Sequence, residues 1–183
     1  MDEVVRAQIA EIQSADRATQ GRAFDFLMEA TDRPVDWAYE AWDDLLAALT
    51  HKDNHQRAIA AQLLCNLSAS DPEGRMLHDF DALLAVTRDE RFVTARHCLL
   101  ALWKIGVAGE PQKRRVVDGL AGRFSDCAAE KNFTLIRFDI LQGLRKLYDR
   151  VKDETIREKA LELIATEDDP KYRKKYASVW KIK

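Results

Sequence analysis

Two histidines four residues apart, His51 and His55, are the pattern in this sequence that comes nearest to a metal site, with Asp53 between them. On one helix this spacing would place both imidazoles on the same face, where they could bind a metal ion. However, Asp53 and Asn54 have side chains that commonly begin helices, so the segment is expected to be a turn between two helices. We therefore predict a solvated turn, no metal site and no cofactor.

The cysteines and the remaining histidines suggest little chemistry. Cys65 and Cys98 stand beside leucines and are expected in the core, whereas Cys127 is expected near a helix end and more exposed. Three widely spaced cysteines without a C-x-x-C pattern predict neither a disulfide framework nor a zinc knuckle, and they favour a reducing, cytoplasmic location. His97 follows Arg96 and is expected on a helix surface. We predict no catalytic residue, and hence a protein that is not an enzyme.

Aromatic residues give a first candidate for partner binding. Trp37, Tyr39 and Trp42 crowd one predicted helix, and Trp42 lies at a repeated core position. Trp37 and Tyr39 lie off that stripe, so at least one of them should be partly exposed. An exposed Trp/Tyr pair would suit a binding hot spot, although packing against a neighbouring hairpin is the favoured interpretation.

Composition and charge restrict the class of protein. Of the 183 residues, 46% are hydrophobic and 33% are charged, and the presence of only 7 Gly and 4 Pro favours long helices. No apolar run reaches the roughly 18 residues that a membrane-spanning helix needs, and the acidic start does not have the pattern of a secretory signal. Residues 1–110 carry 19 Asp/Glu and 11 Lys/Arg, whereas residues 111–183 carry 12 and 18.

The elements that would hold these residues recur along the chain. An apolar stripe with helical spacing repeats at Val5, Trp42, Phe80 and Val117, separated by 37, 38 and 37 residues. Each of these helices is followed by a second amphipathic helix, and turn residues separate the pairs. Gly106 is expected to end the helix before it. The repeating unit is a helical hairpin that can bury its stripe only by stacking on its neighbours.

This period, together with paired helices and an acidic turn residue followed by Arg, resembles HEAT and armadillo repeats. The resemblance implies an all-α, right-handed α-α superhelix (solenoid) of about five hairpins. We expect a single domain over residues 1–183, with approximate repeats 1–33, 34–71, 72–110, 111–151 and 152–183. It also implies a ladder between repeats, in which a turn Asp is followed by a basic residue about six positions later. The matches, in chain order, are Asp16 with Arg22, Asp53 with Arg57, Asp89 with Arg96, Glu130 with Arg137, and Asp169 with Arg173.

Basic residues give the other candidates for partner binding. Equivalent places in the second helices are occupied by Arg57, Arg137 and Arg173, and Arg96 lies one position away. These arginines form either the ladder or a basic row that binds acidic groups of a partner. Residues 171–183 carry six Lys/Arg and no acid, with an aromatic stripe that should close the core. Such a basic end could also dock an acidic partner. The candidates in this segment are Lys171, Arg173, Lys174 and Lys175.

The sequence therefore predicts a protein-binding scaffold, with the acidic half of another copy as one conceivable partner in weak head-to-tail association. Nucleic acid is disfavoured because the N-terminal half is acidic. The resemblance also leaves two classes of enzyme as alternatives. One is the HEAT-like alkylpurine DNA glycosylases, which would need exposed Trp and Asp in a basic concavity. The other is the phycobilin lyases, which handle a chromophore. Deoxyhypusine hydroxylases are disfavoured, because no histidine here is followed by glutamate.

Overall fold

The structure, a computed structural model, describes residues 1–181, and these residues form α-helices and short 3-10 segments with no strand among them. The chain divides into two compact units, Met1–Ala101 and Leu102–Lys183. Each unit is a stack of helical hairpins. Lys183, one of the six basic residues of the C-terminal segment, lies outside the described residues.

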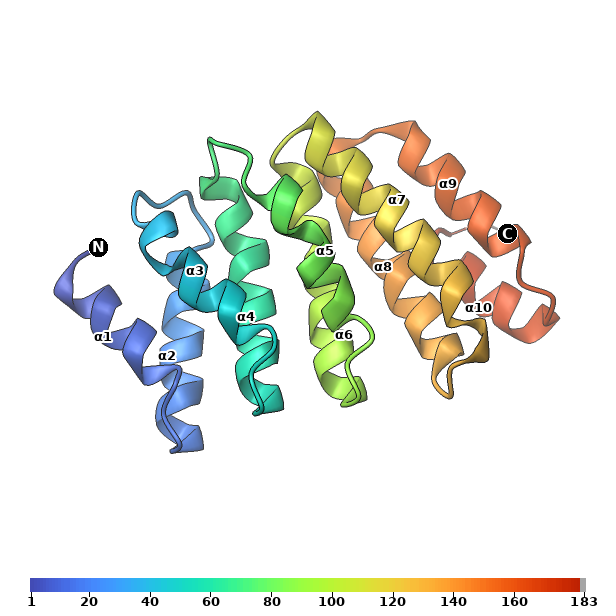
Figure 1. The fold of residues 1–183 in the computed structure, drawn as a ribbon. Helices are drawn as coiled ribbons and strands as arrows, with labels where there is room; N and C mark the ends of the chain where they lie inside the picture. The colour runs from blue at the N-terminus through green and yellow to red at the C-terminus, as the bar shows by residue number, and fades with distance from the viewer. Residues whose placement is uncertain (182–183) are drawn as a thin grey trace. The chain divides into compact units, whose positions relative to one another are not determined.

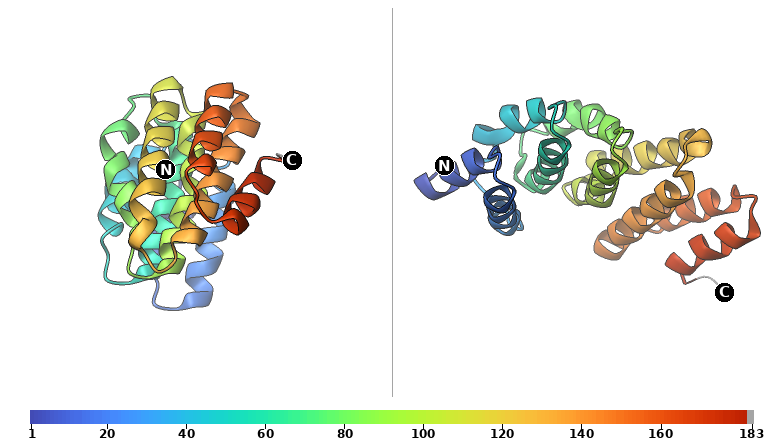
Figure 2. Two further views of the ribbon diagram at one scale, coloured as in Figure 1. Left: turned by 90° about the vertical axis from the view of Figure 1, so that its right-hand side faces the viewer. Right: turned by 90° about the horizontal axis from the view of Figure 1, so that it is seen from below.

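Unit 1 contains three hairpins (Figure 1). The first pairs α1 (Glu3–Glu11) with α2 (Arg17–Ala30), and the second pairs α3 (Ala38–Ala48) with α4 (Asn54–Leu67), which continues into the 3-10 segment η1 (Ser68–Ser70). The third pairs α5 (Met76–Val86) with α6 (Phe92–Ala101). The first helices form one layer and the second helices form another (Figure 2).

Unit 2 begins with a 3-10 segment, η2 (Leu102–Val107), and contains two further hairpins. Helix α7 (Glu110–Asp126) leads through η3 (Cys127–Ala129) to α8 (Phe133–Val151), and α9 (Glu154–Ala165) pairs with α10 (Pro170–Val179). Helix α8 ends at Lys152, which adopts a left-handed conformation with φ 56°.

Aspartates define where many of the helices begin. In α1, α2, α4, α9 and α10 the capping side chain accepts a hydrogen bond from a backbone N–H of the first turn; these residues are Asp2, Asp16, Asp53, Asp153 and Asp169. Each carboxylate thereby satisfies a donor that has no partner inside the helix. This fixes the hairpin turns close to the positions at which the repeat pattern places them.

The predicted repeating register forms the core. Val5, Trp42 and Phe80 are buried, with exposed fractions of 7%, 0% and 0%, and each lies in the first helix of its hairpin. Val117, the fourth member, is only partly buried. This packing confirms the predicted all-α fold class of stacked hairpins, because the stripes become buried only between neighbouring helices.

Two expectations about single residues were wrong. Cys127, the first residue of η3, is fully buried, and its thiol donates to the carbonyl of Phe124 on α7 at 3.2 Å. Gly106 does not end a helix but lies inside η2, where its backbone meets the buried side chain of Leu147. A Cβ at this position would lie 2.8 Å from a Leu147 methyl carbon, so glycine is required for close approach.

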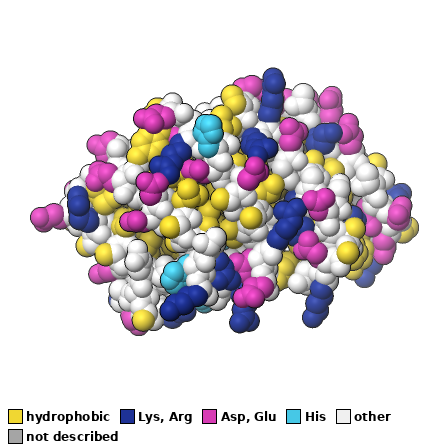
Figure 3. Space-filling model, in the orientation of Figure 1, with side chains coloured by type: hydrophobic (Ala, Val, Ile, Leu, Met, Phe, Trp, Pro, Cys, Tyr) yellow, Lys and Arg dark blue, Asp and Glu magenta, His cyan; other side chains and the backbone are white. Residues whose placement is uncertain are grey.

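The first-helix layer of unit 1 is acidic. Helix α3 carries three acidic residues and no basic one, and α5 carries two acidic residues and no basic one. Figure 3 shows Asp and Glu side chains spread over this face of unit 1, with apolar atoms between them. The charge asymmetry of the sequence is therefore expressed on a surface of the molecule. No helix within residues 1–181 is both long enough and apolar enough to cross a membrane.

Candidate functional site

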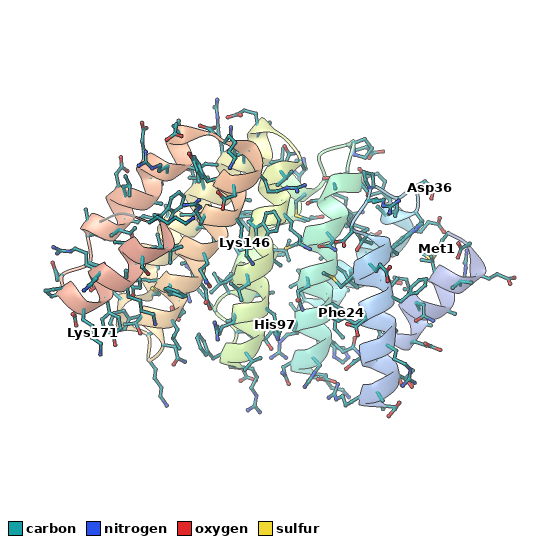
Figure 4. All side chains as sticks on the ribbon, turned by 180° about the vertical axis from the view of Figure 1, so that it is seen from behind. Met1, Phe24, Asp36, His97, Lys146 and Lys171 are labelled. Carbon is teal, nitrogen blue, oxygen red and sulfur yellow. The ribbon has the colours of Figure 1, made fainter. Side chains whose placement is uncertain are left out.

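A hollow of about 430 Å³ lies on the second-helix layer of unit 1, where α4 packs between α2 and α6. We call this hollow the inner groove. Figure 4 looks at the second-helix layer and labels Phe24 on α2 and His97 on α6. Each of the three helices contributes both apolar and polar side chains to it, among them Phe24 and Arg17, Ile59 and His55, and Val93 and His97.

Buried amide side chains hold α2 and α4 to the end of α1. The carbonyl of Ile12 accepts one hydrogen bond from the Gln20 side chain at 2.9 Å and a second from the Gln56 side chain at 2.8 Å. Both glutamines are nearly fully buried, with exposed fractions of 2% and 7%. Because breaking a buried hydrogen bond leaves an unsatisfied polar group, these contacts set the register of the two helices.

Further polar contacts join the helices elsewhere along the groove. Near the ends of α2 and α4, the Asn66 amide donates to Thr31 Oγ1 at 3.0 Å. At the start of α4, the Thr94 hydroxyl of α6 donates to the Asn54 carbonyl at 3.2 Å. The walls of the inner groove are therefore fixed relative to one another by side chains from all three hairpins.

The inner groove has an unusual charge balance for this unit. Among the described residues that line it there is no Asp or Glu, although residues 1–110 carry 19 of them. His55 and His97 are exposed, and neither imidazole has a hydrogen-bond partner within residues 1–181. Desolvation by the surrounding side chains, followed by the charges of Arg96 and His55, lowers the pKa of His97. The groove thus combines an apolar floor with two imidazoles that are available to a ligand.

Tryptophan and aspartate do not line this groove, as a site of the DNA glycosylase type would need. Trp42 is fully buried, and its indole N–H donates to Asp79 at 2.8 Å. Trp37 is 7% exposed and thus offers little surface to a partner. Tyr39 is half-buried, and its hydroxyl donates to Asp71 at 2.6 Å and accepts from the Glu73 N–H at 3.1 Å. These contacts favour packing between hairpins for this aromatic cluster.

The predicted arginine row is largely a ladder, and its pairs run from one hairpin to the next. Arg57 binds Asp89 through two hydrogen bonds, of 2.5 and 2.8 Å. Arg137 pairs with Glu167 at 2.9 Å and lies over the ring of Phe124. Both arginine side chains are almost buried, at 12% and 13% exposed, so the predicted role of Arg57 and Arg137 in reading a partner is not supported by their contacts.

Other predicted ladder pairs differ from the structure. Asp53 is bound by Arg17 from the preceding hairpin at 2.9 Å. Asp16 caps α2, and Arg22 donates to Thr19 Oγ1 at 3.0 Å. Glu130 is bound by the buried Arg123, through hydrogen bonds of 2.7 and 2.8 Å. The acids were found from the sequence, but their partners depend on helix packing, which spacing along one hairpin does not specify.

Two further members of the predicted row differ in exposure. Arg96 is half-buried and lies over the ring of Phe92, which precedes it by one turn on α6. Arg173 is exposed, and its Nε donates to the carbonyl of Glu167 at 2.7 Å.

The C-terminal helix α10 has one buried and one basic face. Tyr176 and Trp180 are 0% and 4% exposed, and the Tyr176 hydroxyl donates to the Thr134 carbonyl at 3.0 Å. The cations Lys171, Lys174 and Lys175 are exposed, with Lys175 lying over the ring of Phe138. The aromatic stripe therefore closes the core of unit 2, and the lysines are available to solvent or to a partner.

The segment around His51 is the turn that the sequence predicts. Asp53 caps α4 by accepting from the His55 N–H, and the Asp53 N–H donates to His51 Nδ1 at 3.0 Å. Within residues 1–181, no three His, Cys, Asp or Glu side chains are grouped as metal ligands would be. His55 instead lines the inner groove, where its imidazole could bind a polar group of a ligand.

Sequence reasoning missed the inner groove. Its members lie in three different hairpins, so no local motif contains them. A signal was nevertheless present: Gly21 and Ala58 are small residues on the second helices, and they leave room between the side chains of neighbouring hairpins. Their importance appears only when the second helices are aligned with one another.

No family model matches the chain, and no curated protein matches its sequence. Among solved structures, the chain is similar to a chain of the complex of CpcE and CpcF of phycocyanin lyase from Nostoc sp. PCC7120. The TM-score is 0.64 at 16% identity, covering 97% of this chain and 98% of that chain. It is also similar to an engineered protein, with a TM-score of 0.54 at 19% identity, covering 98% of this chain and 79% of that chain.

At these identities the likeness establishes a shared fold. The comparison also corrects one prediction. We predicted from the sequence that the chain is not an enzyme, and the structural neighbour contradicts this, because it is part of a lyase. A lack of catalytic motifs in a HEAT-like chain is therefore no argument against an enzymatic role.

Proposed function

We propose that this chain is a helical-repeat subunit of a chromophore-lyase-type enzyme, in which it holds a chromophore and contacts a protein partner. The observation that carries the proposal is the likeness in fold to a phycocyanin lyase chain over almost the full length of both chains. That neighbour was solved as a complex of two proteins, which favours a role in an assembly. A protein-binding role also agrees with the large surfaces that stacked hairpins present.

The chemistry of the inner groove supports the proposal. A bilin chromophore is a conjugated, mostly apolar molecule with carboxylate side arms. The groove offers apolar contacts from Phe24, Ile59 and Val93, and its volume of about 430 Å³ is in the range of small-molecule sites. His55 and His97 offer hydrogen bonds to a carboxylate, and no acidic side chain among the described lining residues opposes it.

We infer that the protein partner is acidic where it meets α10. This helix carries four Lys/Arg and no acid, and the cations involved would be Lys171, Arg173, Lys174 and Lys175. The acidic first helices of unit 1 in another copy have the same complementary charge, which would give weak head-to-tail association at low salt. Tyr39 remains a proposed secondary contact through its exposed part.

Charge reversal tests the basic contact. The variant with Lys174→Glu and Lys175→Glu should keep its helicity, because both side chains are exposed. Sedimentation velocity at low salt should then show reduced self-association relative to the parent chain. Equal sedimentation of the two proteins over the same concentration range would refute the proposed contact.

Binding of a bilin tests the function itself. The intact chain is titrated with biliverdin, and circular dichroism is recorded in the visible absorption bands of the pigment. A fixed, asymmetric site should twist the bound chromophore and induce a saturable signal. A flat spectrum throughout the titration would overturn the proposed chromophore role. Bovine or human albumin, which binds many pigments, is unsuitable as a negative control, so the heat-unfolded chain serves instead.

A further inference from the structure

We propose that the inner groove binds a small, flat, mostly apolar carboxylate, whose anionic end lies between His55 and His97 and whose body lies along Phe24, Ile59 and Val93. This deepens the proposed function by assigning a site and a ligand class to it. The site itself rests on the geometry of unit 1. It therefore holds for conjugated carboxylates generally and can be tested without a bilin.

Apolar side chains on the wall and floor of the inner groove are open to a ligand. Val93 borders the hollow and is 63% exposed, so most of its side chain is open to a ligand. Ile59 forms part of the floor and is 8% exposed. Apolar side chains that line a preformed concavity gain free energy when a ligand displaces the water above them.

The hydrogen-bond donors that line the inner groove differ in whether they already have partners in the protein. Arg17 Nη1 is held by Gln20 at 2.8 Å and by Asp53 at 2.9 Å, so this part of its guanidinium is already engaged within the protein. His55 and His97 add two imidazoles that have no hydrogen-bond partner within residues 1–181. A carboxylate is the common biological group that accepts hydrogen bonds from two donors at once.

A second hollow, in unit 2, shows the contrast. It measures about 320 Å³ and lies between α7 and α9. Its charged side chains already bind one another, since Lys113 pairs with both Glu110 and Asp153. A ligand there would have to compete with existing ion pairs, whereas a ligand in the inner groove would meet open donors.

The charges around His97 predict a pH dependence of binding. The groups that face it are the imidazole of His55 on α4, the guanidinium of Arg17 on α2 and that of Arg96 on its own helix. The carboxylates at the starts of α4 and α6, those of Asp53 and Asp89, are held by Arg17 and Arg57. A bound carboxylate would stabilise the protonated form of His97, so an anionic ligand should bind more tightly as the pH falls and this imidazole gains a proton.

The test uses cis-parinaric acid, a fluorescent conjugated carboxylate, and its methyl ester, with the intact chain. We expect saturable fluorescence enhancement, with the acid binding about tenfold more tightly than the ester, because one charge-assisted hydrogen bond is worth about that factor. Because the pKa of His97 is lowered from its usual value of 6.5, affinity for the acid should rise several-fold between about pH 7 and about pH 5.5, and affinity for the ester should not.

Two variants locate the ligand. Gly21→Leu should fill the groove, since a Cβ at Gly21 meets no atom within 4 Å, and should weaken binding of acid and ester alike. Gly122→Leu is its matched control, because Gly122 also has open space around it but lies on α7. The double variant His55→Gln and His97→Gln should remove the preference for the acid over the ester, whereas His78→Gln on α5 should keep it.

Unchanged binding of parinaric acid in Gly21→Leu, or an unchanged preference for the acid in the double histidine variant, would overturn the proposed site. These outcomes are separable from the fate of the proposed function. Parinaric acid bound in the groove, together with a negative biliverdin titration, would retain the site and refute the chromophore role. Biliverdin binding that is unchanged by all three groove substitutions would retain the chromophore role and refute the site.

Discussion

Breaking the ion pair between Arg57 and Asp89 should destabilise unit 1 more than any exposed pair does. Arg57 Nε and Nη2 bind the two oxygens of Asp89 at 2.5 and 2.8 Å, and Arg57 Nη1 donates to the carbonyl of His51 at 2.7 Å. The guanidinium therefore joins the turn of the second hairpin to the turn of the third. We consider the substitution Arg57→Met, which keeps most of the apolar stem.

The expected loss of stability in Arg57→Met follows from how deeply the two side chains of the pair are buried. The side chains of Arg57 and Asp89 are 12% and 5% exposed, so removing the cation leaves a nearly buried carboxylate. Removal of one partner from a buried pair costs about 3–5 kcal/mol. Because the Arg91 N–H still donates to Asp89 at 2.8 Å, we expect the lower end, about 3 kcal/mol. For a chain of this length that corresponds to a fall in Tm of about 6–12 °C.

The pH dependence gives an independent check. Desolvation acts to raise the pKa of Asp89, but its hydrogen bonds with Arg57 and with the Arg91 N–H leave that pKa lowered overall. A lowered pKa means that the pair stabilises the fold above the unfolded value of about 4 and that this contribution is lost as the pH falls through the folded value. Arg57→Met should therefore flatten the loss of stability in acid.

The assay is urea unfolding followed by circular dichroism and by tryptophan fluorescence, at neutral and at acidic pH. Arg157→Gln is the matched control, because its pair with Glu154 is 3.5 Å long and 49% and 60% exposed, and it should change stability by less than about 0.5 kcal/mol. The double variant with Asp89→Asn should lose less than the sum of the two single variants. An Arg57→Met protein as stable as the control variant would refute this account of the ladder.

Three further substitutions test unit 2. Asp153→Asn should cost about 1–2 kcal/mol at neutral pH, because Lys113 lowers the pKa of Asp153 to about 2. Urea titrations should show that the parent chain loses this contribution only between about pH 4 and pH 2. The same loss of stability over that pH range in Asp153→Asn would contradict the prediction. Gly106→Ala should cost about 1–3 kcal/mol by thermal unfolding, because its Cβ would lie 2.8 Å from a methyl carbon of Leu147. Gly122→Ala, with no atom within 4 Å of its Cβ, should raise stability by about 0.5–1 kcal/mol, and a loss there would be inconsistent with the open site.

The fold could be predicted from the sequence because it depends on a pattern that repeats. Val5, Trp42 and Phe80 recur at nearly constant intervals, and each is buried in the first helix of its hairpin. An apolar stripe is a local signal, since all its members lie on one helix. Stacking was then the only way for short hairpins to bury such stripes, so the repeat implied the fold.

Contacts between hairpins were harder to predict. Asp53 and Asp89 were recognised as turn acids, but the cations that bind them, Arg17 and Arg57, come from the preceding hairpin. Whether Arg17 reaches Asp53 depends on how α2 rotates against α4, which the hydrogen bond from Asn66 to Thr31 helps to fix. Spacing along the chain carries no information about that rotation.

The same buried polar contacts connect the fold to the proposed site. A stack held only by apolar side chains could slide, because dispersion and hydrophobic contacts have little directional preference. Gln56 and Asn66 add directional hydrogen bonds between the first two hairpins, at 2.8 and 3.0 Å, and Gln20 adds one between α1 and α2 at 2.9 Å. These bonds hold α2 and α4 in place relative to each other, and both helices form walls of the groove. A ligand that enters the inner groove would then meet a preorganised site, and its binding would not have to supply the free energy for ordering it.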